Sequence, residues 1–317
     1  MDIMGVPVDG VLAAARAVGI GRVVNVGCDL PSSRWSVATA AEYPEAYATV
    51  AIHPNETSQL NDRRAETLAE IESLAASPEV VAIGETGLDY YRDWSPRDVQ
   101  REWFRAHIEL ARRTGKTLMI HDREAHEDIL AILADEGPWP PSSVIFHCFS
   151  GDARMAARCA AAGYVMSFAG NVTFKNADSL RDAARVAPPE LILAETDAPY
   201  LTPVPHRGKP NSPAMTAYTI RALAALKNMP VADLCAHLQS TGSLTRRRRG
   251  SRPRCPLPPA ADLSPFSAVI ATETWDKYSG QVAARLPRAL IAICGAIARE
   301  TAIKETIHGA KRNKSPP

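Results

Sequence analysis

The chain has 317 residues, of which 46% are hydrophobic and 22% charged, and its net charge is +1. This is enough apolar material for one large domain or two small ones, and the near-neutral charge of the whole chain gives no strong indication for or against polyanionic partners. No charged and apolar leader opens the chain, and no apolar run is long enough to span a bilayer. The six cysteines include no CxxC pair, so we expect reduced thiols and a cytoplasmic location.

Short apolar runs alternate with amphipathic segments through most of the chain, a pattern that predicts parallel strands connected by helices. The expected strands are 22–27, 47–53, 80–83, 117–120, 143–148, 164–168 and 191–195. The expected helices are 8–20, 31–43, 66–76, 95–114, 124–133, 152–162, 178–186, 214–227 and 231–239. Seven strands of this kind predict an α/β barrel of the TIM type, one strand short of the usual eight.

The stretch from Val80 to Asp122 is the unit around which the rest is organised. Its first strand is followed by Glu85 and its second by His121. Between them, Ser95-Pro96 marks the start of a helix and Gly115 marks its end. Parallel barrels present their chemistry past the carboxyl ends of the strands, which is where both polar residues lie.

Other strands also end in acids or histidines. His147 lies at the end of the strand at 143–148, and His53 ends the strand at 47–53. Glu195 ends the strand at 191–195, and Asp197 comes two residues later. A single such residue is usually structural, and for His53 we favour a buried, hydrogen-bonded histidine. Several such residues at one rim predict a site for divalent metal ions such as zinc, manganese or magnesium.

We assign Glu85, His121, His147 and Asp197 as the metal ligands. Glu85 is placed to bridge two ions, and Asp197 to orient the attacking water, so these two are also the predicted catalytic residues. The absence of cysteine from these positions argues against a structural zinc site.

Two basic segments are candidates for binding a polyanion. The loop HRGKPNSP places Arg207 and Lys209 shortly after Asp197, where they would hold a substrate phosphate if the loop is more than solvated surface. The four arginines at 246–249 lie in an Arg/Pro-rich stretch, and we interpret them as a solvated segment with only nonspecific attraction for polyanions.

The motifs IHP, GETGLDYY, IHDREA, FHCFSGD, ETDAPYL and RGKPNSP together resemble the TatD-family metal-dependent deoxyribonucleases, within the amidohydrolase-like barrels. The resemblance covers about residues 6–238. It implies a (β/α)8 barrel, a two-metal site and hydrolysis of phosphodiester bonds at DNA 3′ ends, in the manner of a 3′–5′ exonuclease. It also implies that Glu85 bridges the two ions, that His121 and His147 bind one of them, and that Asp197 binds the other.

The chain departs from that family at both ends. The family begins with a strand that carries a His-x-His pair for the first metal, and no histidine precedes His53 here. We therefore expect a barrel that lacks its first strand and remains open, with SAVIA at 267–271 as one candidate replacement. We divide the chain into a hydrolase barrel at 1–239 and a low-complexity extension at 240–317, disordered except for a short helix near 281–304.

These observations leave three functions open. The first is a metal-dependent hydrolase that cleaves DNA or a small phosphodiester, with divalent ions as cofactors. The second is a related barrel hydrolase that acts on esters or amides. The third is an inactive or nucleic-acid-binding fragment, because the histidine pair is absent. We expect a monomer without membrane association.

Overall fold

The structure, a computed structural model, describes residues 7–244 and 269–272 of the chain. Its strands are β1 Val23–Val26, β2 Ala46–Val50, β3 Val80–Asp89, β4 Thr117–Arg123, β5 Val144–Phe146, β6 Val165–Phe168, β7 Ile192–Ala194 and β8 Val269–Thr272. Its α-helices are α1 Val8–Ala17, α2 Leu30–Glu42, α3 Thr57–Leu60, α4 Arg64–Ala75, α5 Arg97–Thr114, α6 His126–Asp135, α7 Ala153–Ala161, α8 Asp178–Val186, α9 Thr216–Leu226 and α10 Val231–Leu244.

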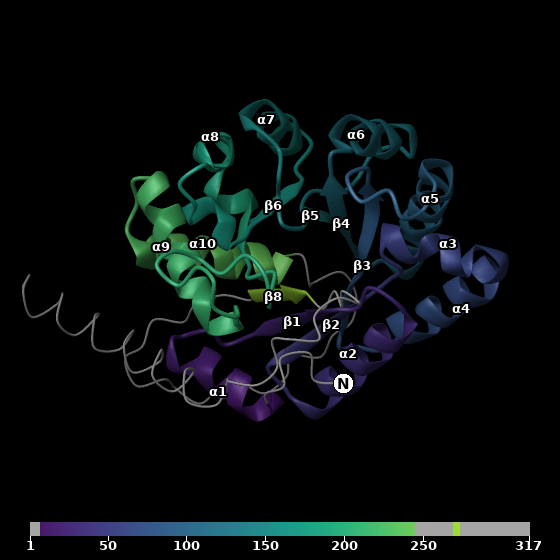
Figure 1. The fold of residues 1–317 in the computed structure, drawn as a ribbon, viewed down its shortest axis with the longest axis horizontal. Helices are drawn as coiled ribbons and strands as arrows, with labels where there is room; N and C mark the ends of the chain where they lie inside the picture. The colour runs from purple at the N-terminus through teal and green to yellow at the C-terminus, as the bar shows by residue number, and fades with distance from the viewer. Residues whose placement is uncertain (1–6, 245–268, 273–317) are drawn as a thin grey trace, which may run out of the picture.

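Strands β1 to β7 lie side by side in chain order, all parallel, and curl into a half-barrel with the helices around the outside (Figure 1). The predicted TIM-type α/β fold is confirmed. This arrangement brings the carboxyl ends of all these strands to one rim, as the position of the acids and histidines in the sequence requires.

An eighth strand covers the edge of β1. Strand β8 pairs with β1 in parallel, from Val23 opposite Val269 to Val26 opposite Thr272. Its Cα atoms also come within 8 Å of β7, so it lies between the two ends of the seven-stranded sheet. The segment 267–271 considered as a replacement strand is thus close to the one observed, and the edge of β1 is not left unpaired.

Two groups of buried side chains hold the layers together. The larger fills the space between sheet and helices, and includes Trp103, Phe104 and Ile108 of α5, all fully buried. The smaller lies inside the curl of the sheet and consists of Val24, Val26, Cys28, Ala82, Met119, Ile145, Val165 and Leu193. Because strand residues alternate between the two faces, one or two residues from most strands make this inner layer, which fills the inside of the barrel.

The helix boundaries follow the predicted signals with small differences. Helix α5 begins at Arg97 with Pro96 at its N-cap position, and it ends at Gly115, whose φ of 67° provides the left-handed turn expected of a C-terminal glycine. The hydroxyl of Ser95 does not cap the helix but accepts a hydrogen bond from the Ser58 N–H.

The predicted extension is only partly described. Helix α10 continues to Leu244, past the expected boundary at 239, and β8 lies within the predicted 240–317 segment. The helix expected near 281–304 falls outside the described residues, and the division into two regions stays a prediction.

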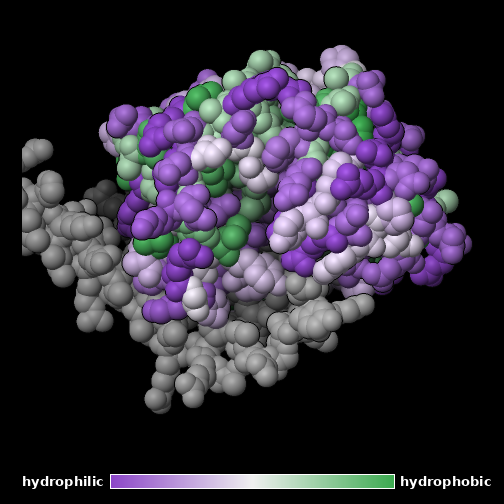
Figure 2. Space-filling model, turned by 45° about the horizontal axis from the view of Figure 1, so that its top comes forward, coloured by the Kyte–Doolittle hydropathy of each residue, from purple (hydrophilic) through white to green (hydrophobic). Residues whose placement is uncertain are grey.

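The surface is largely hydrophilic in the view of Figure 2, with hydrophobic residues in small groups. Among the helices of the described residues, none combines the length and apolarity that crossing a membrane requires.

Candidate metal centre

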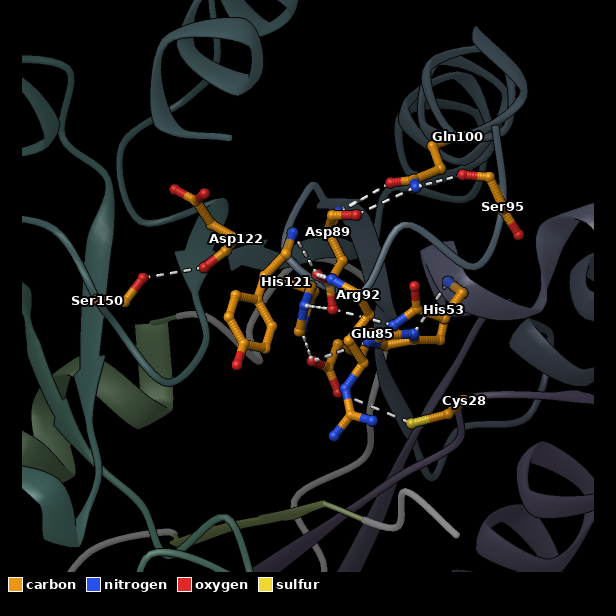
Figure 3. Close-up of polar contacts among 12 residues, drawn as sticks. Cys28, His53, Glu85, Asp89, Arg92, Ser95, Gln100, His121, Asp122 and Ser150 are labelled. Carbon is orange, nitrogen blue, oxygen red and sulfur yellow. Dashed lines mark hydrogen bonds and ion pairs between the residues drawn. The ribbon is translucent and has the colours of Figure 1, made fainter. Parts of the chain in front are cut away.

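The four predicted ligands come from β3, β4, β5 and β7, with β6 between the last two. Glu85 lies within β3 and His121 within β4, while His147 directly follows β5 and Asp197 lies shortly after β7. Glu85 and His147 are buried, whereas His121 and Asp197 are partly exposed. Figure 3 shows Glu85 and His121 pointing toward one another, with His53 and Asp89 close by.

Two glycines let β3 approach β4 closely enough for this contact. A Cβ atom on Gly87, whose φ is +141°, would lie 2.1 Å from the His121 carbonyl oxygen. A Cβ atom on Gly84 would lie 2.5 Å from the Cβ of Met119. No side chain fits at either distance, so the glycines of the GETG motif are what bring Glu85 next to His121.

The Oε1 atom of Glu85 is the focus of three imidazoles. It lies 2.6 Å from His121 Nδ1, 3.9 Å from His147 Nε2 and 3.9 Å from His53 Nε2. The Oδ1 atom of Asp197 lies 3.7 Å from His147 Nε2. The structure therefore brings the four predicted residues together, as a shared ligand set requires, while their individual metal roles stay predictions.

Two further carboxylates support the histidines from behind. The Nε2 atom of His121 lies 3.3 Å from Asp89 Oδ2. The Nδ1 atom of His147 lies 2.9 Å from Glu195 Oε2, although the two are not aligned as a hydrogen bond. A carboxylate beside the far nitrogen of a ligating histidine orients the ring and raises its basicity, so Asp89 and Glu195 lie where such carboxylates are expected at a metal site.

The carboxylates dominate the electrostatics of the centre. Burial opposes charge on His121, but hydrogen bonds to Asp89 and Glu85 outweigh it and raise the pKa of His121 to about 9. Burial likewise opposes charge on His147, but the carboxylates of Glu195 and Glu85 raise its pKa well above the ordinary value. Burial acts to raise the pKa of Glu85, yet the surrounding imidazoles hold it well below its usual range.

His53 behaves differently. Burial, reinforced by the neighbouring His121, lowers the pKa of His53 to about 3, so its ring is neutral at physiological pH. The rings of His53 and His121 meet edge to face, with their centroids 4.3 Å apart. The expectation of a buried, hydrogen-bonded histidine thus agrees with its surroundings, but His53 also faces Glu85.

These residues fit a divalent cation. Buried carboxylates raise the pKa of His121 and His147, and the same negative charge would attract a metal ion. Both carboxylate oxygens of Glu195 are buried without an aligned hydrogen-bond donor among the described residues. One ligand atom each from His53, Glu85 and His121 lie within 4.8 Å of one another. Imidazole and carboxylate donors suit zinc, manganese or iron, and no cation is specified further by this set.

The predicted phosphate ligands lie on a separate loop. Arg207 and Lys209 are exposed, and the Arg207 guanidinium carbon lies 3.9 Å from the centre of the Phe174 ring. Neither Asp89 nor Glu195 was among the ligands predicted from the sequence. Asp89 follows Glu85 by four residues, a spacing that returns a strand to the same face and was the available signal.

A barrel with imidazoles and carboxylates gathered at its strand ends is the arrangement of a metal-dependent hydrolase, and the relatives agree. The metal-dependent hydrolase TatD of Mycobacterium tuberculosis is 50% identical over 222 residues, which are 68% of this chain and 81% of the relative. The metal-dependent hydrolase YabD of Bacillus subtilis is 39% identical over 226 residues, 71% of this chain and 87% of the relative.

Residues 6–241 match the family described as TatD related DNase, and the chain belongs to the TatD family. Among solved structures, the fold is similar to that of the TatD homolog YJJV from Escherichia coli K12. The TM-score is 0.69 at 25% identity, over 75% of this chain and 91% of that one.

Proposed function

We propose that this metal-dependent hydrolase cleaves phosphodiester bonds at the 3′ ends of single-stranded DNA. The observation that carries the proposal is the convergence of His121, His147 and His53 on one oxygen of Glu85, with Asp197 beside His147. Such a site suits the attack of water on an anionic centre, and DNA is the substrate that the family resemblance indicates.

Each residue has a distinct task in this reaction. Glu85, His121 and His147 would hold a divalent cation, which lowers the pKa of water and stabilises charge on a phosphoryl oxygen. Asp197 orients the attacking water and accepts its proton at Oδ1. Arg207 and Lys209 bind the phosphate, Arg207 through a planar fork and Lys209 as a point charge.

Exposed aromatic side chains next to the site support a single-stranded substrate. Tyr91 and Trp94, on the loop after β3, are 60% and 54% exposed, and Tyr200, on the loop after β7, is 41% exposed. Guanidinium groups stack on two of these rings, Arg123 on Tyr91 and Arg92 on Trp94. Unpaired bases stack on aromatic and guanidinium planes regardless of sequence, which favours a single strand over a duplex.

The test compares a 3′-labelled single-stranded oligonucleotide with a panel of simple esters and amides. We expect release of nucleotides from the 3′ end, loss of activity on chelation, and no activity in Glu85→Gln. Hydrolysis of only the esters or amides would contradict the proposal and favour a related barrel hydrolase that acts on those substrates.

The non-catalytic alternative has its own test. If deletion of 240–317 abolished DNA binding while Glu85→Ala left it unchanged, the extension would be the binding element and the barrel an inactive scaffold. A cytoplasmic location and a monomeric state remain predictions from the sequence.

A further inference from the structure

The three imidazoles around Glu85 differ in what their far nitrogens meet. For His121 and His147, the nitrogen that faces away from Glu85 lies against a carboxylate, Asp89 or Glu195. A carboxylate can only accept, so a carboxylate beside the far nitrogen favours a proton there. A cation can then displace the proton from the nitrogen that faces Glu85 and take its lone pair.

His53 is the opposite case. It precedes the short 3-10 turn Pro54–Glu56, and its Nδ1 atom accepts a hydrogen bond of 3.2 Å from the Asn55 N–H. An imidazole nitrogen that accepts a hydrogen bond carries no proton, so the ring is neutral and its proton sits on Nε2. Nε2 is the atom that faces Glu85.

The backbone around His53 fixes this arrangement. The His53 N–H donates to the Cys28 carbonyl oxygen at 2.7 Å. The preceding N–H, of Ile52, donates to Nε2 of the buried His107 at 3.2 Å, and His107 Nδ1 lies 2.8 Å from the Trp103 carbonyl oxygen. The His53 ring is therefore anchored on a segment tied to β1 through Cys28 and to α5 through His107.

We propose that His53 is a neutral hydrogen-bond donor of the site, and that its Nε2–H binds an anionic oxygen of the substrate rather than a metal ion. To ligate a metal through Nε2, the ring would have to move its proton to Nδ1, where the Asn55 N–H already points. The proximity of His53 to Glu85 and His121 thus does not make it a ligand.

The distance to Glu85 leaves this donor available to a substrate. Nε2 lies 3.9 Å from Glu85 Oε1, beyond hydrogen-bond range. That the oxygen belongs to a phosphoryl group rests on the proposed function, whereas the position of the proton does not. A preorganised donor of this kind strengthens as charge develops on the substrate oxygen.

Metal binding separates a donor from a ligand. His53→Asn keeps the turn, because asparagine is a preferred N-cap, but removes Nε2. We expect calorimetric titration with Zn²⁺ to give the wild-type affinity for His53→Asn and a large loss for His121→Asn. An equal loss in both variants would overturn the proposal.

The position of the proton can be read directly. In protein labelled with ¹⁵N-histidine, we expect His53 to show a protonated Nε2 and an unprotonated Nδ1, both before and after addition of Zn²⁺. Loss of the Nε2 proton on metal addition would show ligation and overturn the proposal.

Inorganic phosphate tests the donor without relying on DNA cleavage. We expect Zn²⁺-loaded His53→Asn and His53→Phe to bind phosphate roughly 10–100-fold more weakly than wild type, as loss of a hydrogen bond to a charged group implies. His237→Asn, on α10, is the matched control and should bind normally. Unchanged phosphate binding in the His53 variants would remove the donor role, whereas absence of DNA cleavage alone would refute only the proposed function.

Discussion

Strand β3 carries Glu85 near its middle, β4 carries His121 near its carboxyl end, and His147 directly follows β5. Strands β1 and β8, by contrast, end in Val26 and Thr272. Both regions of the sheet have the same parallel pairing. The segment Val269–Thr272, VIAT, contains no residue of the types that bind metals. A strand's pairing depends on backbone groups that every residue has, so another sequence can cover the edge of β1. Metal ligation depends on particular side chains, and β8 supplies none of the types that bind metals.

Removing the charge of Glu85 should have the largest effect, since its Oε1 is the atom common to all three imidazoles. We expect wild-type protein to retain about one tightly bound divalent ion per chain. Glu85→Gln should lose that ion. Activity should fall by more than the roughly 10–100-fold that is typical when a residue that only contacts a metal ligand is replaced. Elemental analysis after desalting gives the stoichiometry. Two tightly bound ions in wild type would break the comparison, because the β1–β8 side would then have ligands of its own.

The close approach of β3 to β4 can be tested at Gly87. Gly87→Ala would place a Cβ atom 2.1 Å from the His121 carbonyl oxygen, so we expect a loss of about 3 kcal/mol in the free energy of unfolding. Gly137 is the matched control, because its φ of +86° is also left-handed but no atom lies within 4 Å of the position that a Cβ atom would take. Gly137→Ala should cost only about 1 kcal/mol. Equal losses in urea unfolding would mean that β3 and β4 can separate without penalty.

Glu195→Gln tests the carboxylate behind His147. Because the Glu195 carboxylate lies 2.9 Å from the far nitrogen of His147 and favours a proton there, we expect zinc affinity to fall roughly 10–100-fold while the fold is retained. Glu190→Gln, at an exposed position on the turn before β7, should leave the affinity unchanged. If both variants bound zinc like wild type in a chelator competition, Glu195 would have no part in the centre.

The raised pKa of His121 predicts a pH dependence for the metal-free protein. Since the pKa rises from 6.5 unfolded to about 9 folded, the stabilisation is fully present below pH 6.5 and is lost as the pH rises through 9. The difference in urea midpoint between wild type and His121→Asn should therefore shrink across that range. Zinc should abolish the trend, because the ion displaces the proton. A difference that stays constant with pH would mean that the ring is not protonated in the folded protein.

Local patterns in the sequence were enough for the order of the elements. The apolar runs and the glycine after α5 predicted seven strands and most helices within a few residues, because these signals act on neighbouring residues. The four ligand candidates could also be predicted from the sequence, since parallel strands bring their ends to one rim.

The features that could not be predicted from the sequence depend on contacts between distant segments. Strand β3 continues to Asp89 although Gly84 and Gly87 interrupt its apolar pattern, because those glycines serve the contact with β4. The roles of Asp89 and Glu195 arise only where they meet histidines from other strands. The position of β8 beside β1 joins segments that lie near opposite ends of the chain, which no local pattern specifies.

The smallest effect is expected from proline substitutions in β8. Successive N–H groups of a strand point to opposite sides, so only one of Ile270 and Ala271 donates toward β1, and the other serves as its control. Proline at the donating position removes one hydrogen bond, about 1 kcal/mol, and should lower the melting temperature by roughly 2–4 °C. Zinc content should be unchanged in both variants, because β8 supplies pairing and no ligand. Loss of zinc would show that the β1–β8 side takes part in the centre, while two unchanged melting temperatures would show that β1 does not depend on this strand.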